Sequence, residues 1–135
     1  MDITITNEQE NISILHLSGA LDGQTYRELV TAAQGVLTGG AKNILIDMSE
    51  LSFISSAGLV ALHVTALISR GEAMPNLDQG WTALKSVGTS REGGMQKHVK
   101  LLNPRKEIVD VLEMVGFSLF FEIFTDKDKA LKSFS

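Results

Sequence analysis

Residues 47–60 read Asp47-Met48-Ser49-Glu50-Leu51-Ser52-Phe53-Ile54-Ser55-Ser56-Ala57-Gly58-Leu59-Val60. Just before them, Ile44-Leu45-Ile46 form an unbroken apolar run, which is typical of a strand that is covered on both faces. A second apolar segment begins at Ala57 and predicts a helix. The stretch therefore predicts a buried strand, a serine-rich turn and a helix whose N-terminus carries hydroxyl groups.

Ser55 and Ser56 are the two serines of this turn. Either can cap the helix, because a serine oxygen accepts a hydrogen bond from a backbone N–H that has no partner in the first turn. The same N–H groups, together with the positive end of the helix dipole, favour a phosphate or an acidic partner group. Helix capping and phosphate-dependent signalling are therefore compatible predictions for these residues.

Size and composition restrict the class of protein. The chain has 135 residues, the size of one ordinary domain, and 44% of them are apolar, which is enough for a core. A formal net charge of -4 argues against a nucleic-acid surface. Cysteine is absent from the sequence, which excludes disulfides and thiolate metal sites. We interpret one locally basic group as a solvated strand-to-helix surface: Lys97, His98, Lys100, Arg105 and Lys106.

The sequence predicts neither a membrane span nor a metal centre. The longest apolar stretch, from Ala57 to Ile68, is too short to span a bilayer and is interrupted by His63. The first residues lack the basic and apolar regions of a signal peptide. His16, His63 and His98 lack the spacing of metal ligands. We therefore expect a soluble, cytoplasmic protein.

The first forty residues predict a hairpin followed by a helix. Ile3–Thr6 and Ile12–Leu17 alternate or nearly alternate, and a polar segment separates them. Gly19 is expected to end the second strand. Asp22 is well placed to cap the following helix, and Gly39-Gly40 to stop it.

The second half predicts further alternation of strands and helices. Residues 73–96 do not read as regular structure and are expected to form an inserted loop or flap that contains Trp81. Val99–Leu102 predicts a strand, and Asn103-Pro104 a helix start. Leu119–Phe124 predicts a last strand before a short terminal helix. The expected fold is α/β, with a mixed β-sheet of about four to five strands and helices packed against it.

Three motifs in this order give the chain a family resemblance. They are Gly19-Ala20-Leu21-Asp22-Gly23-Gln24-Thr25, the stretch 47–59, and Leu101-Leu102-Asn103-Pro104 followed by Gly116-Phe117. With them the chain resembles a STAS domain of the anti-sigma factor antagonist family over nearly its whole length. The resemblance implies a single STAS domain at 1–135, with the insertion at about 73–96.

The resemblance implies a non-enzymatic partner switch without a cofactor, a metal or a nucleic acid. In the family, the serine that corresponds to Ser56 is phosphorylated by a partner that is both a serine kinase and an anti-sigma factor. The unphosphorylated domain binds this partner, and the phosphorylated domain releases it until a phosphatase removes the phosphate. Ser55 stands where the family has an aspartate, so it is the alternative acceptor. The implied docking face comprises Asp22, Gly23, Thr25, Ser55, Ser56, Ala57 and Gly58.

Two other functions remain open at this point. The chain could be a constitutive STAS interaction module of a larger signalling or transport assembly, in which Ser55 and Ser56 only cap the helix. It could instead sense a small ligand, with the flap around Trp81 closing over a pocket. The sequence does not fix the oligomeric state, and a homodimer is one option.

Overall fold

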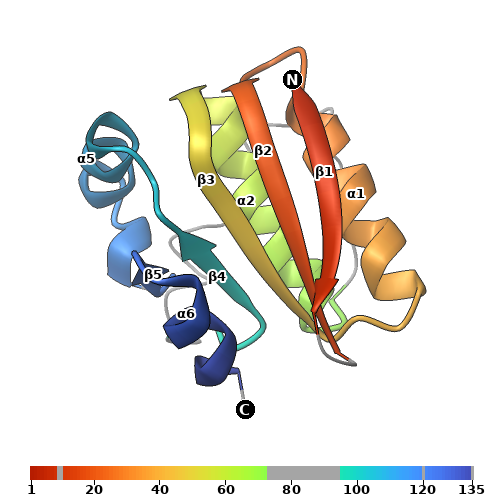
Figure 1. Ribbon diagram of the computed structural model, residues 1–135. Helices are drawn as coiled ribbons and strands as arrows, with labels where there is room; N and C mark the ends of the chain where they lie inside the picture. The colour runs from red at the N-terminus through yellow and green to blue at the C-terminus, as the bar shows by residue number, and fades with distance from the viewer. Residues whose placement is uncertain (9–10, 73–94, 120, 135) are drawn as a thin grey trace.

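The computed structural model describes residues 1–8, 11–72, 95–119 and 121–134. Its elements alternate along the chain much as the sequence predicts, as Figure 1 shows. In chain order they are β1 (Asp2–Glu8), β2 (Ile12–Leu21), α1 (Tyr26–Thr38), β3 (Asn43–Ile54), α2 (Ser56–Ser69), β4 (Val99–Leu102), α5 (Lys106–Met114), the 3-10 helix η3 (Phe117–Leu119), β5 (Ile123–Phe124) and α6 (Lys127–Ser133).

The strands form one mixed sheet in the order β1-β2-β3-β4-β5. β1 pairs with β2 antiparallel, which confirms the predicted hairpin. The other neighbouring pairs are parallel, so the carboxyl ends of β2, β3 and β4 lie at the same edge of the sheet. The predicted mixed α/β fold is thereby confirmed.

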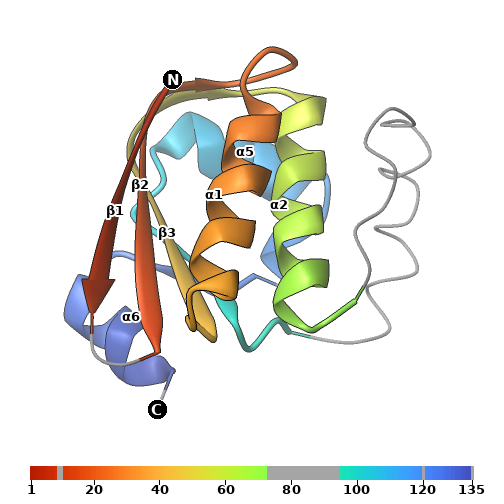
Figure 2. The same cartoon turned by 90° about the vertical axis from the view of Figure 1, so that its right-hand side faces the viewer.

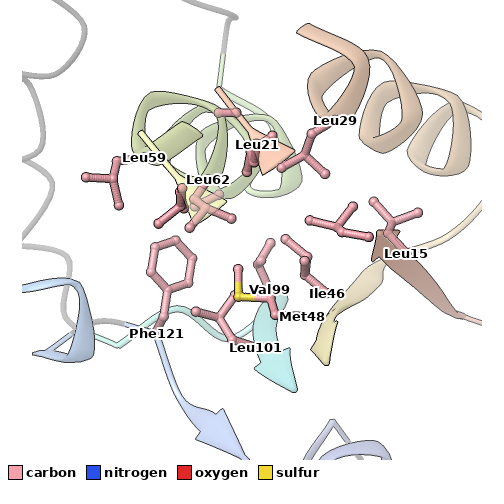
Figure 3. Close-up of a cluster of buried hydrophobic side chains, with 14 of the residues drawn as sticks. Leu15, Leu21, Leu29, Ile46, Met48, Leu59, Leu62, Val99, Leu101 and Phe121 are labelled. Carbon is pink, nitrogen blue, oxygen red and sulfur yellow. The ribbon is translucent and has the colours of Figure 1, made fainter. Parts of the chain in front are cut away.

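Helices cover both faces of this sheet. Figure 2 shows α1 and α2 side by side on one face and α6 on the opposite face. The larger core lies under α1 and α2, where side chains from strands and helices point into a common interior, as Figure 3 shows for Ile46, Leu62 and Phe121. A smaller cluster beneath α6 joins Ala130 to strand residues Ile14, Leu45 and Leu102.

The helix after Ser55 is apolar nearly all round because it is enclosed by protein. Every residue of α2 from Gly58 to Ala66 is buried. The central run Ile44-Leu45-Ile46 is also fully buried, since its two faces contact the two different core clusters. The predicted burial of the central strand is confirmed.

The prediction that Gly19 ends the second strand is wrong. Strand β2 continues to Leu21, and its pairing with β3 shifts register between Gly19 and Ala20. Gly19 has φ +106°, a backbone conformation that glycine adopts without a side-chain penalty. The glycine therefore permits an irregularity within the strand and does not terminate it.

Two expectations near the C-terminus also need correction. Asn103 has φ +55° and lies outside α5, which begins at Lys106 with Arg105 as its N-cap, so Asn103-Pro104 forms the approach to the helix. The last strand is shorter than Leu119–Phe124, since Leu119 belongs to η3 and only Ile123 and Phe124 pair with β4. These two residues pair with Leu101 and Leu102, so the first half of β4 has no partner in β5.

The basic segment around residue 100 is not uniformly solvated. Lys100 is 5% exposed, and its Nζ donates to the Ser133 carbonyl (3.1 Å) and lies 2.9 Å from the Ser133 hydroxyl. The same ammonium lies 3.3 Å from a carboxylate oxygen of Glu122 and 4.8 Å from the ring centre of Phe134. Through these contacts, the side chain of Lys100 in β4 links α6 to the sheet.

Within the described residues, no helix is long and apolar enough to cross a membrane. Nor does the described part of the chain contain a group of three or more histidine, cysteine or acidic side chains that could hold a metal ion. Trp81 and most of the flap expected at 73–96 lie outside the described residues.

Candidate functional site

The first two motifs meet at the carboxyl ends of β2 and β3. Because these strands are parallel, Leu21 pairs with Ile54 although 33 positions separate them in the sequence. The Ser55 N–H then donates to the Leu21 carbonyl oxygen at 2.9 Å. The turn after β2 and the serine turn after β3 are thus neighbours.

Gly58 lets α2 approach this junction closely. A Cβ atom at Gly58 would lie 2.6 Å from the Leu21 carbonyl oxygen and 2.7 Å from Cγ1 of Ile54. Real Cβ atoms do not make such short contacts, so any larger residue would push the helix away. Gly58 is buried and therefore fixes the position of the serine turn without contributing a side chain to its surface.

Asp22 and Thr25 close the turn that follows β2. The Thr25 hydroxyl accepts from the Asp22 N–H (2.9 Å) and donates to the Ala20 carbonyl (2.8 Å). An Asp22 carboxylate oxygen accepts from the Gln24 N–H at 2.9 Å. Thr25, which makes no side-chain cap bond, is the N-cap of α1, so the prediction that Asp22 caps this helix is wrong. The turn leaves Gly23 and Gln24 exposed.

The two serines of the second turn differ in what their hydroxyl groups do. Ser55 is the N-cap of α2, and its Oγ accepts from the Gly58 N–H at 3.4 Å. Ser56 is the first helical residue and is exposed, and within the described part of the chain no hydrogen bond occupies its hydroxyl. The predicted serine cap is therefore Ser55, and Ser56 presents the accessible hydroxyl. Ala57, the next residue, is partly buried.

Two residues that were not predicted as site residues lie in or contact the 47–60 stretch. Phe53, just before the turn, is 52% exposed. Arg105, from the approach to α5, donates from Nε to the Ser49 carbonyl at 3.1 Å and lies 3.7 Å from a Glu50 carboxylate oxygen. The inward–outward alternation of a strand could have predicted Phe53, because the neighbouring Ile54 is buried. The hydrogen bond between Arg105 and Ser49 could not be predicted from the local sequence around either residue.

A chain of side-chain hydrogen bonds links three neighbouring strands of the sheet. His16 lies between Thr6 and Asp47, with Nε2 3.0 Å from the Thr6 hydroxyl and Nδ1 2.8 Å from Oδ2 of Asp47. Burial alone would raise the pKa of Asp47, but the backbone N–H of Ser49 and the His16 ring stabilise its charge, so the pKa lies below its usual value. These bonds link β1, β2 and β3. They also fix the position of Asp47, the first residue of the 47–60 stretch.

Comparisons with known proteins agree with this geometry. The family described as Mlab, STAS domain, matches residues 5–73, about half of the chain. No curated protein matches it.

Similar solved structures share the fold. An anti-sigma factor antagonist from Mycobacterium paratuberculosis has a TM-score of 0.69 at 17% identity, covering 98% of this chain and 92% of that one. The anti-sigma factor antagonist SpoIIAA in its unphosphorylated form has a TM-score of 0.62 at 15% identity, over 97% and 94% of the two chains. The phosphorylated form of SpoIIAA, a Bacillus cell fate determinant, scores 0.56 at 15% identity, over 97% of each chain. With its mixed sheet, its two joined motifs and the family match, the chain belongs to the STAS domain family.

Proposed function

We propose that this protein is a partner-switching regulator of the anti-sigma factor antagonist type and that Ser56 is its phosphate acceptor. The main supporting observation is that the two serines at the start of α2 have different roles. Ser55 uses its hydroxyl as the helix cap, whereas Ser56 is exposed and offers its hydroxyl to solvent. A kinase can reach the second hydroxyl without breaking the cap.

Electrostatics supports a switch at this position. A phosphate adds roughly -1.5 to -2 charges near neutral pH. The N–H groups of the first turn and the helix dipole would stabilise that charge, so α2 would stay folded. A docked partner would lose contact with a neutral serine and meet a bulky anion. Phosphorylation would therefore act by repulsion and lost fit.

The proposed partners are a serine kinase that also acts as an anti-sigma factor and a phosphatase that resets the switch. SpoIIAA, which shares the fold, has been solved in unphosphorylated and phosphorylated forms, as such a cycle requires of that protein. We propose a non-catalytic role in the cytoplasm, where a kinase finds ATP, without cofactor, metal or nucleic acid. The docking face would comprise the exposed parts of the Asp22–Thr25 turn, Ser55, Ser56 and Ala57, positioned by Gly58.

The first experiment localises the phosphate. The purified protein is incubated with ATP and lysate from its own host, and the tryptic peptide 43–70 is analysed by fragmentation mass spectrometry. We expect phosphate on Ser56 in the wild type and in Ser55→Ala, and none on this peptide in Ser56→Ala. Phosphate on Ser55 would move the acceptor by one residue. A working kinase, shown on a control substrate, that leaves both serines unmodified would contradict the proposed switch.

The second experiment separates charge from shape. Ser56→Asp places a negative charge at the acceptor position, and Ser56→Asn is its neutral match of nearly equal size. We expect the partner captured by the wild type to be retained by the Asn variant and lost by the Asp variant, while circular dichroism shows the same fold for all three. Retention by the Asp variant would count against a charge-driven release.

A constitutive interaction module is the second candidate, because much of the docking face already serves the fold. The side chains of Asp22, Thr25 and Ser55 all make hydrogen bonds that shape their own turns. This candidate predicts a stable complex that is insensitive to Ser56→Asp. The third function, a sensor closed by the Trp81 flap, stays a prediction, as does the homodimer. The sensor function would be tested by measuring whether a ligand changes the fluorescence of Trp81.

A further inference from the structure

The free edge of the sheet at β1 lacks the usual protection against strand pairing. Among the described residues, β1 pairs only with β2, so one side of this seven-residue strand has no partner. Natural edge strands are commonly protected by lysine, proline, a bulge or a covering element. The stretch Asp2–Glu8 contains neither lysine nor proline, and its register with β2 is unbroken. Figure 2 views this side of the molecule and shows α1 beside β1, with no other described element in front of the strand.

An apolar groove follows this edge on the side of α1. Two hollows of about 480 and 570 Å³ lie between β1 and α1, and Ile5 lines both of them. Ile3 on the strand and Ala32 and Val36 on the helix contribute to their apolar walls. Ile3 packs against the larger core, whereas Ile5 is 47% exposed. The edge therefore offers unpaired backbone groups together with an exposed apolar side chain.

The side chains of β1 are matched best by a second copy of the same strand. Its charged residues, Asp2 and Glu8, stand at the two ends and are both acidic. Glu8 is already paired with Lys127, whose Nζ lies 3.1 Å from Oε1 of Glu8. Between the ends, isoleucine and threonine alternate in residues 3–6. Such a strand is apolar on one face and hydroxylic on the other, and an identical strand presents the same two faces.

We propose that β1 pairs antiparallel with β1 of a second copy around a two-fold axis at Thr4. In this register Ile3 faces Ile5 of the second copy, and Asp2 faces Thr6 of the second copy, so no two acidic side chains are opposite each other. An axis at Ile5 would instead set Asp2 against Glu8 and is disfavoured by their like charges. The charges at the ends of the strand thus select the register.

This association would stop at a dimer. A two-fold axis uses the same surface on both copies, so pairing consumes both free edges at β1. The edge strand on the other side of each sheet, β5, has only two residues and offers little to a further copy. Two five-stranded sheets would therefore join into one. The proposal rests on none of the residues proposed for phosphorylation.

The first test measures association of the full chain by sedimentation velocity over a series of concentrations. We expect a reversible dimer with a dissociation constant below about 1 mM. Ile5→Lys places a charge where natural edge strands use one to prevent pairing, and it should raise the dissociation constant at least about tenfold. Met114→Lys is the matched control, since it makes the same kind of change at an 83% exposed residue of α5, and it should leave the constant unchanged.

Two outcomes of this test would overturn the proposal. The first is a wild-type chain that stays monomeric up to about 1 mM, as expected if the edge receives a strand of a different protein. The second is a dimer that is equally stable in Ile5→Lys. Circular dichroism of each variant shows that the fold is retained.

Disulfide cross-linking tests the register independently of Ile5→Lys. Because the sequence contains no cysteine, each variant carries only the introduced thiol. Thr4→Cys places the two Cβ atoms opposite each other at about 4.5–5.5 Å. Asn7→Cys, the control on the same strand, places them about six positions apart along the strand, or about 20 Å. We expect Thr4→Cys to form the disulfide dimer at least about tenfold faster under mild oxidation. Equal rates, or faster cross-linking through Asn7→Cys, would contradict the proposed pairing.

Discussion

At Gly58, a single hydrogen in place of a side chain sets the distance between α2 and the end of β2. We predict that Gly58→Ala costs about 1–3 kcal/mol of unfolding free energy, because the new methyl group would overlap the Leu21 carbonyl and the Ile54 side chain. Urea denaturation measures this loss directly.

Gly35→Ala is the matched control for that prediction. Gly35 lies on the exposed side of α1, and a Cβ there would meet nothing within 4 Å. Since alanine favours helix more than glycine does, we expect this variant to gain about 0.5–1 kcal/mol. Losses of similar size in both variants would contradict a specific close approach at Gly58.

The adjacent serines should differ in stability as they differ in role. Ser55→Ala removes the cap of α2 and should cost about 0.5–1 kcal/mol, at the lower end for N-caps because the bond to the Gly58 N–H is long at 3.4 Å. Ser56→Ala should change the unfolding free energy by less than about 0.5 kcal/mol, as is usual for exposed positions. Chemical denaturation of the two variants decides this. A larger loss of unfolding free energy in Ser56→Ala than in Ser55→Ala would indicate that Ser56 is the cap.

Local sequence was enough to predict a serine cap for α2, although not which serine provides it, and it misassigned the role of Asp22. A serine that precedes an apolar helix predicts a cap, whichever tertiary contacts follow. Asp22 also has a capping side chain, yet its carboxylate closes a turn with the Gln24 N–H. The difference depends on the Thr25 hydroxyl reaching back to Ala20, a contact that residue preferences do not encode.

Among the elements, α6 is attached to the sheet mainly through its last turn. Lys100→Met should keep most of the packing against Phe124 and Phe134 but remove the hydrogen bonds to Ser133. We expect a loss of about 1–3 kcal/mol and faster amide exchange in α6. Hydrogen exchange with mass spectrometry resolves this helix from the rest.

Lys129→Met serves as the comparison, because Lys129 is exposed on the same helix. It should leave the exchange of α6 unchanged. Exchange that is equally fast in both variants would show that α6 depends on its own helix propensity and not on the buried ammonium.

Elements with a regular apolar period were predictable, and elements determined by pairing were not. The buried residues of α1, Leu29, Val30 and Ala33, follow helical spacing, and the helix ends at Gly39-Gly40 as predicted. By contrast, β2 continues past Gly19 because β3 offers a parallel partner as far as Ile54. Only two residues of β5 pair with β4, at Leu101 and Leu102, although the apolar sequence run is longer. The extent of strand pairing leaves little trace in the local sequence.

For the whole molecule, the buried His63 and the partly buried Asp47 make stability depend on pH. Burial lowers the pKa of His63, the charge of Arg70 lowers it further, and Glu72 opposes them. The unfolded chain therefore takes up a proton near the usual value of 6.5, while the folded chain resists it. This contribution is fully present above that pH and is lost as the pH falls towards the lower pKa of the folded state.

Asp47 adds a second decline in more acidic solution. Its folded pKa lies below the usual 3.8, so its contribution is present above that value and disappears as the pH falls through the folded one. We expect the unfolding free energy to fall first below about pH 6.5 and again below about pH 3.8. Denaturation at a series of pH values checks this. His63→Gln should flatten only the first decline and Asp47→Asn only the second.

If Ser56 is the phosphate acceptor, as proposed, the junction of Leu21, Ile54 and Gly58 also determines what its kinase must recognise. An isolated peptide of residues 47–63 would lack the sheet that orders this turn, and its short helical part would be marginal in water. We therefore expect a kinase to modify the intact domain and to ignore the peptide, which parallel assays with radiolabelled ATP can compare. On the proposed function, only chains that have completed folding would then be phosphorylated, so unfolded chains would be excluded from the proposed switch.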